Sequence, residues 1–309
     1  MDLQEQLLAG NKYLYIEKID SDTIFRMTFR NIGQVQLFLS SDPVRNDRIF
    51  TEYKSITAET EFAGPELSQA ISYCIGGYEE NYDYFLKFAH QLEKINMQYT
   101  KVNRPEKSFV GHRPNVPAYI AGAPKTMYRA KRAVEKKVVN VFMNVTYPAS
   151  TIETQIQHRG IIALNLIQIL EMNNYIVNFR LFEISKVKRE MFICEVGLKN
   201  PGEKMDPRKC YYPMCGKSFV RRVLARIKES MPFNERWGFS YGSVLVESKV
   251  RQYMNVGEND IYIGSPDDMN IKGENIFDDT DAVLEKLGLK GKIFVPDYKR
   301  EAMAEAIEE

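Results

Sequence analysis

The sequence predicts an α/β fold in which helices cover a mixed sheet, and three consecutive segments carry that prediction. Residues 138–146 form an apolar run rich in β-branched residues, as is typical of a buried strand. Residues 151–172 then keep the spacing of a long helix, and Ser150 and Glu153 have the spacing of a capping box at its start. Residues 176–182 are a second strand-like run. Strand, helix and strand in this order form a βαβ unit, whose strands we expect to be parallel.

The segments that follow extend this unit. Residues 189–198 predict a third strand that pairs with the second through a short hairpin, and residues 260–264 predict a late strand. Residues 217–230 have the periodicity of an amphipathic helix. Asp279 is expected to help cap a last helix that Gly288 ends. Four basic residues are predicted on the outer face of helix 217–230: Arg221, Arg222, Arg226 and Lys228.

The first hundred residues predict a mixture of strands and helices. Residues 24–30 alternate apolar and polar side chains, which predicts a half-buried strand, whereas residues 35–39 fit either a strand or a short helix. Residues 72–78 are interpreted as a break before a helix over residues 79–96. The break contains Gly76-Gly77, which lacks the Gly-x-x-x-x-Gly-Lys pattern of a phosphate loop and therefore favours a plain turn.

Prolines and glycines between residues 105 and 124 predict an irregular connector, and a helix is predicted from Pro124 to Lys136. We therefore expect an N-terminal α+β region over residues 1–100, a Pro-rich basic connector and helix over 101–137, and an α/β domain over 138–309. Within residues 101–137, ten basic residues stand against two acidic ones, a net charge of +8.

Composition places the chain among globular proteins. It has 309 residues, of which 44% are hydrophobic and 27% charged, with a net charge of +1. This length can bury a large core. No apolar run is long enough for a membrane span, and the N-terminus lacks the pattern of a secretory signal. With only four cysteines and no disulfide pattern, the expected location is cytoplasmic.

The central unit resembles a von Willebrand factor A-like domain, in which the first strand of a Rossmann-like sheet ends in Asp-x-Ser-x-Ser and holds a divalent metal. The matching positions here are Asn144, Thr146 and Pro148, with Ser150 two residues further on. A hard cation prefers anionic oxygen ligands, which these residues do not supply. Asn144, Thr146 and Ser150 are thus degenerate metal-site positions, and we expect neither a metal nor another cofactor.

The chain as a whole is similar to a family of bacteriophage proteins of unassigned function. The similarity rests on residues 76–80, on Asn-Val-Pro-Ala-Tyr-Ile-Ala-Gly-Ala-Pro-Lys-Thr-Met at 115–127, and on His158-Arg159-Gly160. It implies an origin in a phage or another mobile element, and the cytoplasm of the host cell as the location. His158 and Arg159 are expected on the surface of the central helix, with contact to a bound anion as the alternative.

Two classes of function stay open, and an enzyme is the less expected third. The sequence shows no Ser-His-Asp spacing, and Cys210 and Cys215 lack the further ligands of a zinc site. The leading interpretation is a non-enzymatic module that binds a protein through its metal-poor A-like domain. The alternative is nucleic-acid binding through residues 101–137, where Tyr119 and Tyr128 could stack on bases. Candidate nucleic-acid contacts are Lys125, Arg129, Lys131, Arg132, Lys136, Lys137, Arg221 and Arg222.

Overall fold

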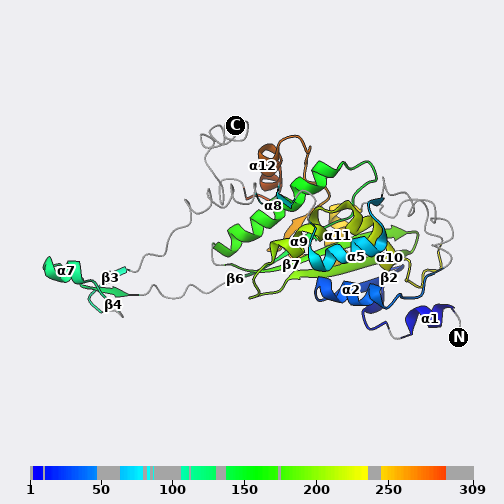
Figure 1. The fold of residues 1–309 in the computed structure, drawn as a ribbon, viewed down its shortest axis with the longest axis horizontal. Coiled ribbons are helices and arrows are strands. Elements are labelled where there is room, and N and C mark those ends of the chain that lie inside the picture. Colours follow the sequence, from blue (N-terminus) through cyan, green and yellow to red (C-terminus); the bar gives the residue numbers. More distant parts are fainter. Residues whose placement is uncertain are drawn as a thin grey trace.

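The centre of the protein is a mixed six-stranded sheet (Figure 1). The computed structural model describes residues 3–9, 11–46, 63–78, 82–83, 86, 106–110, 113–129, 137–172, 175–235 and 245–289. The strand order is β1-β2-β8-β7-β6-β9. The sheet and its covering helices confirm the predicted α/β class. The strands are β1 (Leu14–Ile19), β2 (Asp22–Phe29), β6 (Lys137–Asn144), β7 (Tyr175–Val187), β8 (Glu190–Lys199) and β9 (Ile261–Ile263).

The predicted βαβ unit is confirmed. Strands β6 and β7 are parallel, and helix α8 (Glu153–Met172) connects them. Strand β8 pairs with β7 in an antiparallel hairpin, and β9 lies parallel to β6 on its other side. Ser150 and Glu153 do not form the predicted capping box. The amide of Ile152, directly before α8, donates to Gln155 Oε1 at 3.1 Å, which is only one of the two hydrogen bonds of such a box.

The N-terminal strands belong to the same sheet. Strand β2 lies parallel to β8, and β1 pairs with β2 in an antiparallel hairpin. Phe25 and Phe29 of β2 share one hydrophobic cluster with Val141 and Phe179 from β6 and β7. The N-terminal strands and the segment after residue 137 therefore share one hydrophobic core. Residues 101–137 do not divide the chain into two parts with separate cores.

Two helices follow β2. Helix α2 (Ile32–Ser40) resolves the open choice over residues 35–39 in favour of a helix. Helix α5 (Leu67–Gly76) shows that the predicted break at 72–78 was placed too early, since the helix ends only where Gly77 adopts a φ of 89°. Most of the predicted helix 79–96 lies outside the described residues.

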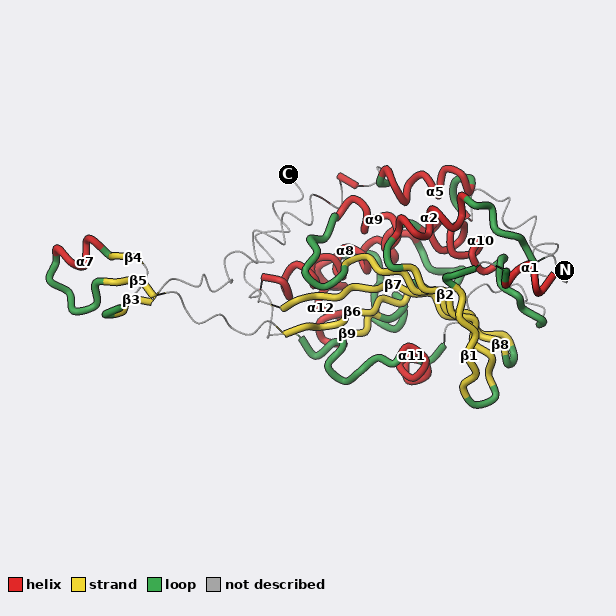
Figure 2. The backbone as a smooth tube through the Cα atoms, turned by 90° about the horizontal axis from the view of Figure 1, so that it is seen from below, coloured by secondary structure: helices red, strands yellow, loops and turns green. Residues whose placement is uncertain are grey.

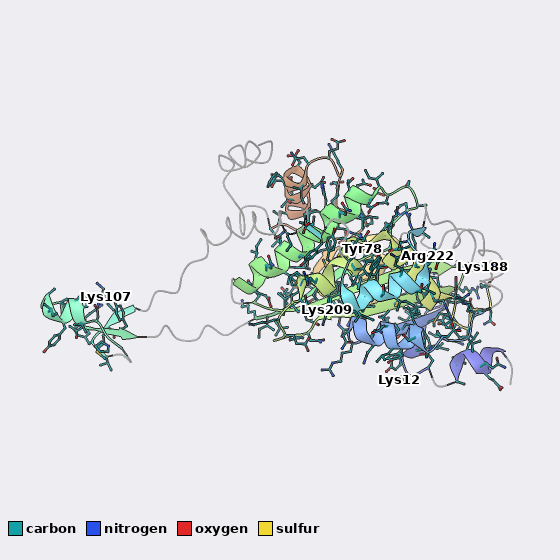
Figure 3. The ribbon with its side chains drawn as sticks, in the orientation of Figure 1. Lys12, Tyr78, Lys107, Lys188, Lys209 and Arg222 are labelled. Atoms are coloured by element: carbon teal, nitrogen blue, oxygen red, sulfur yellow. The ribbon has the colours of Figure 1, made fainter. Side chains whose placement is uncertain are left out.

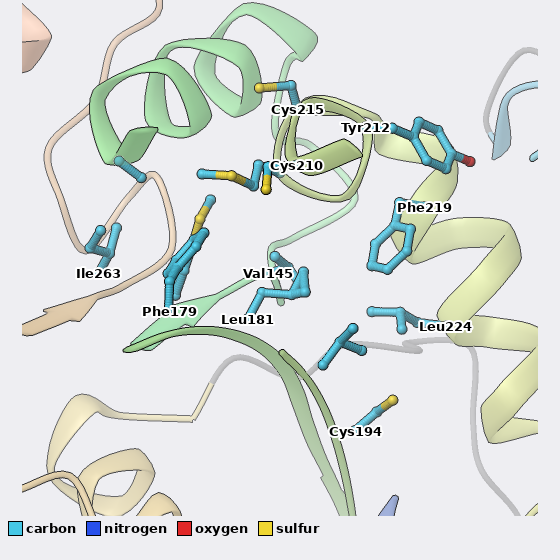
Figure 4. Close-up of a cluster of buried hydrophobic side chains, with 14 of the residues drawn as sticks. Val145, Phe179, Leu181, Cys194, Cys210, Tyr212, Cys215, Phe219, Leu224 and Ile263 are labelled. Carbon is cyan, nitrogen blue, oxygen red and sulfur yellow. The ribbon is translucent and has the colours of Figure 1, made fainter. Parts of the chain in front are cut away.

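Helices cover both faces of the sheet (Figure 2). Helices α2, α5, α8 and α9 (Pro207–Cys215), with the helical segment that follows α9, bury one face, while α11 (Glu247–Met254) packs on the other. Helix α12 (Ile276–Lys286) packs beside α8. Figure 4 shows the larger core, in which sheet residues meet residues of α9 and of the segment that follows it: Val145, Phe179, Leu181, Cys194, Cys210, Tyr212, Cys215, Phe219 and Leu224.

The predicted helix 217–230 is present, but most of the face that was predicted to be exposed to solvent is buried. It consists of the π-helical segment η1 (Phe219–Leu224) followed by α10 (Ala225–Lys228). Of the four basic residues predicted outside, Arg222, Arg226 and Lys228 are buried. The helical periodicity gave the wrong exposure for two reasons. The N-terminal part of the chain covers Arg222 and Arg226, whose Nη2 atoms donate to Gly64 O and Asp42 Oδ1, each at 3.1 Å, and Lys228 faces the sheet, where it pairs with Glu183 of β7.

The connector contains a small unit of its own. Strands β3 (Glu106–Ser108), β5 (Met127–Arg129) and β4 (Arg113–Pro114) form a second sheet in that order, with helix α7 (Val116–Ile120) between β4 and β5. We call residues 106–110 and 113–129 the module. Figure 2 draws the module away from the six-stranded sheet. The predicted helix from Pro124 is wrong over residues 127–129, which form a strand.

Candidate functional site

The positions predicted as a degenerate metal site lie at and beyond the carboxyl end of β6, and two of them make hydrogen bonds that stabilise the fold. Asn144 Oδ1 accepts from the Thr146 amide at 2.9 Å, and Asn144 Nδ2 donates to the Tyr262 hydroxyl at 3.4 Å. Thr146 Oγ1 accepts from the Ile184 amide at 2.9 Å and donates to the Ile184 carbonyl at 3.1 Å. Ser150 is exposed in the loop beyond. Within the described part of the chain, no three His, Cys, Asp or Glu side chains gather as metal ligands.

Arg159 occupies this same edge of the sheet, and the prediction that it lies on the helix surface is wrong. Its side chain is 1% exposed. Nη1 donates to the carbonyl of Asn144 at 2.8 Å and to that of Gly264 at 3.3 Å, so the guanidinium bridges the ends of β6 and β9. Burial lowers the pKa of Arg159 to about 10, which leaves it charged at neutral pH.

Tyr147 lies beside this guanidinium. The ring centroid of Tyr147 is 5.7 Å from the guanidinium carbon of Arg159 and also 5.7 Å from that of Arg221. Arg221 is half-buried, lies in the π-helical segment η1, and donates from Nη2 to the carbonyl of Ala149 at 3.2 Å. Two cations therefore lie over one aromatic ring near the start of α8.

The neighbouring His158 is also buried rather than exposed. Its Nδ1 is 2.7 Å from Asp279 Oδ2. Asp279 further accepts from the amides of Lys272 and Gly273, at 2.8 and 2.9 Å. The predicted capping role of Asp279 is therefore wrong: α12 begins earlier, with Asn275 as its N-cap, and Asp279 joins the preceding loop to α8.

The cysteines do not form a reactive site. Cys74, Cys194, Cys210 and Cys215 are all free and buried. Burial is the main cause that raises the pKa of each thiol, so that none of them is a thiolate at neutral pH.

The predicted nucleic-acid contacts are only partly available for binding. Arg222 is buried, burial lowers its pKa, and Figure 3 shows it within the body of the protein, whereas Lys107 lies on the module. Lys125 and Lys137 are exposed. The side chain of Arg129 and the whole of Lys131, Arg132 and Lys136 lie outside the described residues.

The module carries a surface that the sequence did not predict. Five large apolar side chains are exposed there: Phe109 (67%), Val110 (78%), Val116 (56%), Tyr119 (74%) and Ile120 (79%). Lys125 Nζ lies 6.0 Å from the centre of the Phe109 ring. We call these five residues the module's apolar surface. Their pairs in the sequence, Phe-Val at 109–110 and Tyr-Ile at 119–120, were the available signal, but no periodicity linked them.

Comparison with known proteins identifies the family. The model of a domain of unknown function, DUF7192, matches residues 11–291. The chain belongs to the DUF7192 family. The match spans both the six-stranded sheet and the module, so both lie within the limits of this DUF7192 domain. Neither the curated proteins nor the solved structures contain a significant match to the chain.

No described helix of this DUF7192 chain is both long and apolar enough to cross a bilayer.

Proposed function

We propose that this DUF7192 chain is a non-enzymatic protein that binds another protein, and that the module supplies the binding surface. The observation that carries the proposal is the module's apolar surface, whose five members lie within residues 109–120. Exposed apolar patches of this kind mark interaction sites in proteins. Phe109 and Tyr119 add aromatic side chains, which are enriched at the centres of protein interfaces.

The small size of the module supports this reading. Its three strands have two or three residues each, and its only buried side chains among the described ones are those of Asn115 and Ala118. Such a unit buries little apolar surface by itself. Contact with a partner would remove the apolar side chains from water, a gain of about 25 cal/mol for each Å² of apolar area.

The charge of the module indicates the kind of partner. Lys107 and Lys125 of the module are exposed, and the module has four basic residues against one acidic one, a net charge of +3. A protein with an apolar patch rimmed by carboxylates complements this surface, since opposite charges steer association and fix orientation.

Support for a non-enzymatic role comes from the sheet edge. Asn144 and Thr146 direct their polar groups to the backbone and to Tyr262, and the carboxylate of Asp279 holds a loop. The resemblance to A-like domains and to bacteriophage proteins adds a phage or mobile-element origin to the proposal, on sequence similarity alone.

A photo-crosslinking amino acid tests the proposal. We would place it at Tyr119 in the full chain and, as a matched control, at Tyr15, which is 62% exposed on β1. In cells that express the chain naturally, position 119 should give a discrete protein adduct that Ile120→Ser abolishes, and position 15 should give none. Equal adducts from both positions, or an adduct to nucleic acid alone, would contradict the proposal.

Nucleic-acid binding is the second candidate, favoured by exposed Lys107 and Lys125 in the module that also exposes the rings of Phe109 and Tyr119. If it holds, DNA or RNA mobility shifts should weaken steeply with salt. Lys107→Glu and Lys125→Glu should each lower the slope of log affinity against log salt by about 1, and Lys204→Glu, an exposed control far along the chain, should not. No shift at low salt would exclude this candidate.

A further inference from the structure

A cavity of about 540 Å³ lies beside the C-terminal end of α2, between this helix and α1 (Leu3–Leu8). The residues that line it fall within 6–13 and 37–44, with Ser230 from the segment after α10. Pockets that hold small ligands have volumes of about 300–1,000 Å³. The cavity therefore has room for a small organic molecule, and its lining includes neither the carboxyl edge of the sheet nor the module.

The cavity has an apolar wall that contains two aromatic rings. Phe38 is 8% exposed and Tyr13 is half-buried, and their ring centroids are 5.9 Å apart with the planes at 86°. Leu37 and Val44 also line the cavity, and they are 64% and 46% exposed. A further ring placed here would cover this apolar surface and make edge or face contacts with the two rings. The wall thus favours a ligand with an aromatic body.

The charges that line the cavity leave one cation in excess. They are those of Lys12 and Asp42. Arg226, which is 4% exposed, donates from Nη2 to Asp42 Oδ1 at 3.1 Å and so offsets that carboxylate. Lys12 is exposed, its Nζ lies 5.2 Å from the centre of the Tyr13 ring, and it forms no ion pair within the described part of the chain. Figure 3 shows Lys12 near α2. An anionic group on the ligand would complement this lysine.

The other polar side chains of the wall are already used by the protein. The hydroxyls of Ser41 and Ser230 each donate to a backbone carbonyl at 2.6 Å, and Asn11 Oδ1 accepts from a backbone amide at 3.2 Å. The ammonium group of Lys12 is therefore the strongest polar contact that the cavity offers to a ligand.

We propose that this cavity binds a small aromatic carboxylate, with the ring of the ligand against Tyr13 and Phe38 and its carboxylate paired with Lys12 Nζ. An apolar cavity with one well-placed charged group is the usual composition of a small-ligand site. The proposal does not depend on the function proposed for the module.

Calorimetric titration of the full chain with naphthoate tests the site, and naphthamide serves as the uncharged ligand of the same shape. The wild type should bind naphthoate saturably and more tightly than naphthamide. Absence of saturable naphthoate binding would overturn the proposal and leave the cavity as a surface for a protein segment. Equal affinities for the two compounds would also overturn it, because Lys12 would then have no role in recognition.

A charge variant tests the part assigned to Lys12. Lys12→Gln should weaken naphthoate binding about threefold to fivefold, as expected for an exposed ion pair, and should leave naphthamide binding unchanged. Lys18→Gln is the matched control, because Lys18 is exposed on β1 and does not line the cavity. Equal effects of Lys12→Gln and Lys18→Gln would mean a non-specific charge effect and would refute the site.

An apolar pair of variants locates the ring of the ligand. Leu37→Ser should weaken naphthoate and naphthamide alike, whereas Ile75→Ser, at a position that is 51% exposed on α5 and outside the cavity, should weaken neither. Ile120→Ser should bind naphthoate as the wild type does. A loss of binding in Ile120→Ser with none in Leu37→Ser would assign the ligand to the module's apolar surface and overturn the proposal.

Discussion

The six-stranded sheet and the module distribute charge and apolar surface in opposite ways. The helix-covered sheet buries charged groups, such as Arg159 and the ion pair of Lys228 with Glu183. The module leaves Phe109, Tyr119 and other large apolar side chains in solvent. Buried charges are tolerated only where fixed partners offset their desolvation, and exposed apolar side chains contribute little to the stability of the unit that carries them. The sheet is therefore the part whose variants should unfold the protein, and the module the part whose variants should leave it folded.

The largest effect is expected at the buried ion pair. Lys228 on α10 and Glu183 on β7 are 0% and 2% exposed, and burial raises the pKa of Glu183 while Lys228 opposes the rise. Lys228→Met leaves the carboxyl group without its cation and should lower the free energy of unfolding by about 3–5 kcal/mol. Glu183→Met in the same chain should restore most of the loss. Urea denaturation measures both, and a loss in the single variant below about 1 kcal/mol would show that the pair is not needed.

A smaller loss is expected where α8 meets α9. A Cβ at Gly160 would lie 2.3 Å from Cys215 Sγ and 3.1 Å from the carbonyl oxygen of Met214. Gly160→Ala should therefore lower stability by about 1–3 kcal/mol through overpacking, and Cys215→Ala should recover part of it. Gly76→Ala is the control, since nothing lies within 4 Å of its Cβ position. A melting temperature that is lower for Gly76→Ala than for Gly160→Ala would contradict the packing described for α8.

Acid should weaken the sheet through Asp22. The hydrogen bond from Lys186 is the main cause that holds the pKa of Asp22 below its ordinary value, and Tyr253 donates a second one at 2.8 Å. A lowered pKa means that the folded state favours the carboxylate. Its contribution is thus present above the unfolded pKa and is lost as pH falls through the folded one. Asp22→Asn should be less stable than the wild type at pH about 7, and the gap should narrow at pH about 3. A constant gap in denaturant midpoints across this range would contradict the assignment.

The smallest effect on stability is expected in the module. Phe109→Ser and Ile120→Ser replace side chains that are 67% and 79% exposed, and each should change the free energy of unfolding by less than about 0.5 kcal/mol. The same variants should abolish the protein adduct formed from position 119. A melting temperature that falls as far as that of Lys228→Met would show that these residues belong to a core, which would remove the contrast with the sheet.

The sequence predicted those parts of the fold whose pattern is contained in a short run of neighbouring residues. The apolar runs and the helical spacing around residues 137–199 correspond to β6, α8, β7 and β8. It failed where exposure depends on distant segments. Arg159 bonds to carbonyls 15 and 105 residues away, and Arg222 to one 158 residues away, which no local periodicity contains.

The module was missed for a related reason. Residues 127–129 form a strand because residues 106–108 and 113–114 pair with them on either side, and the basic residues that follow suggested a helix instead. The apolar surface depends on that pairing and on α7, neither of which a connector rich in proline and glycine predicts.

The strand pairing at the base of the module determines which changes in sequence the fold can tolerate there. Glu106 and Arg129, its first and last residues, stand opposite each other in the β3–β5 pair, so the backbone leaves and returns at neighbouring points. Residues between those points can be lengthened, shortened or replaced without altering the order of the six strands. Different members of the family could therefore carry different surfaces on the same scaffold, and a foreign loop grafted between residues 106 and 129 should be accepted by the folded sheet.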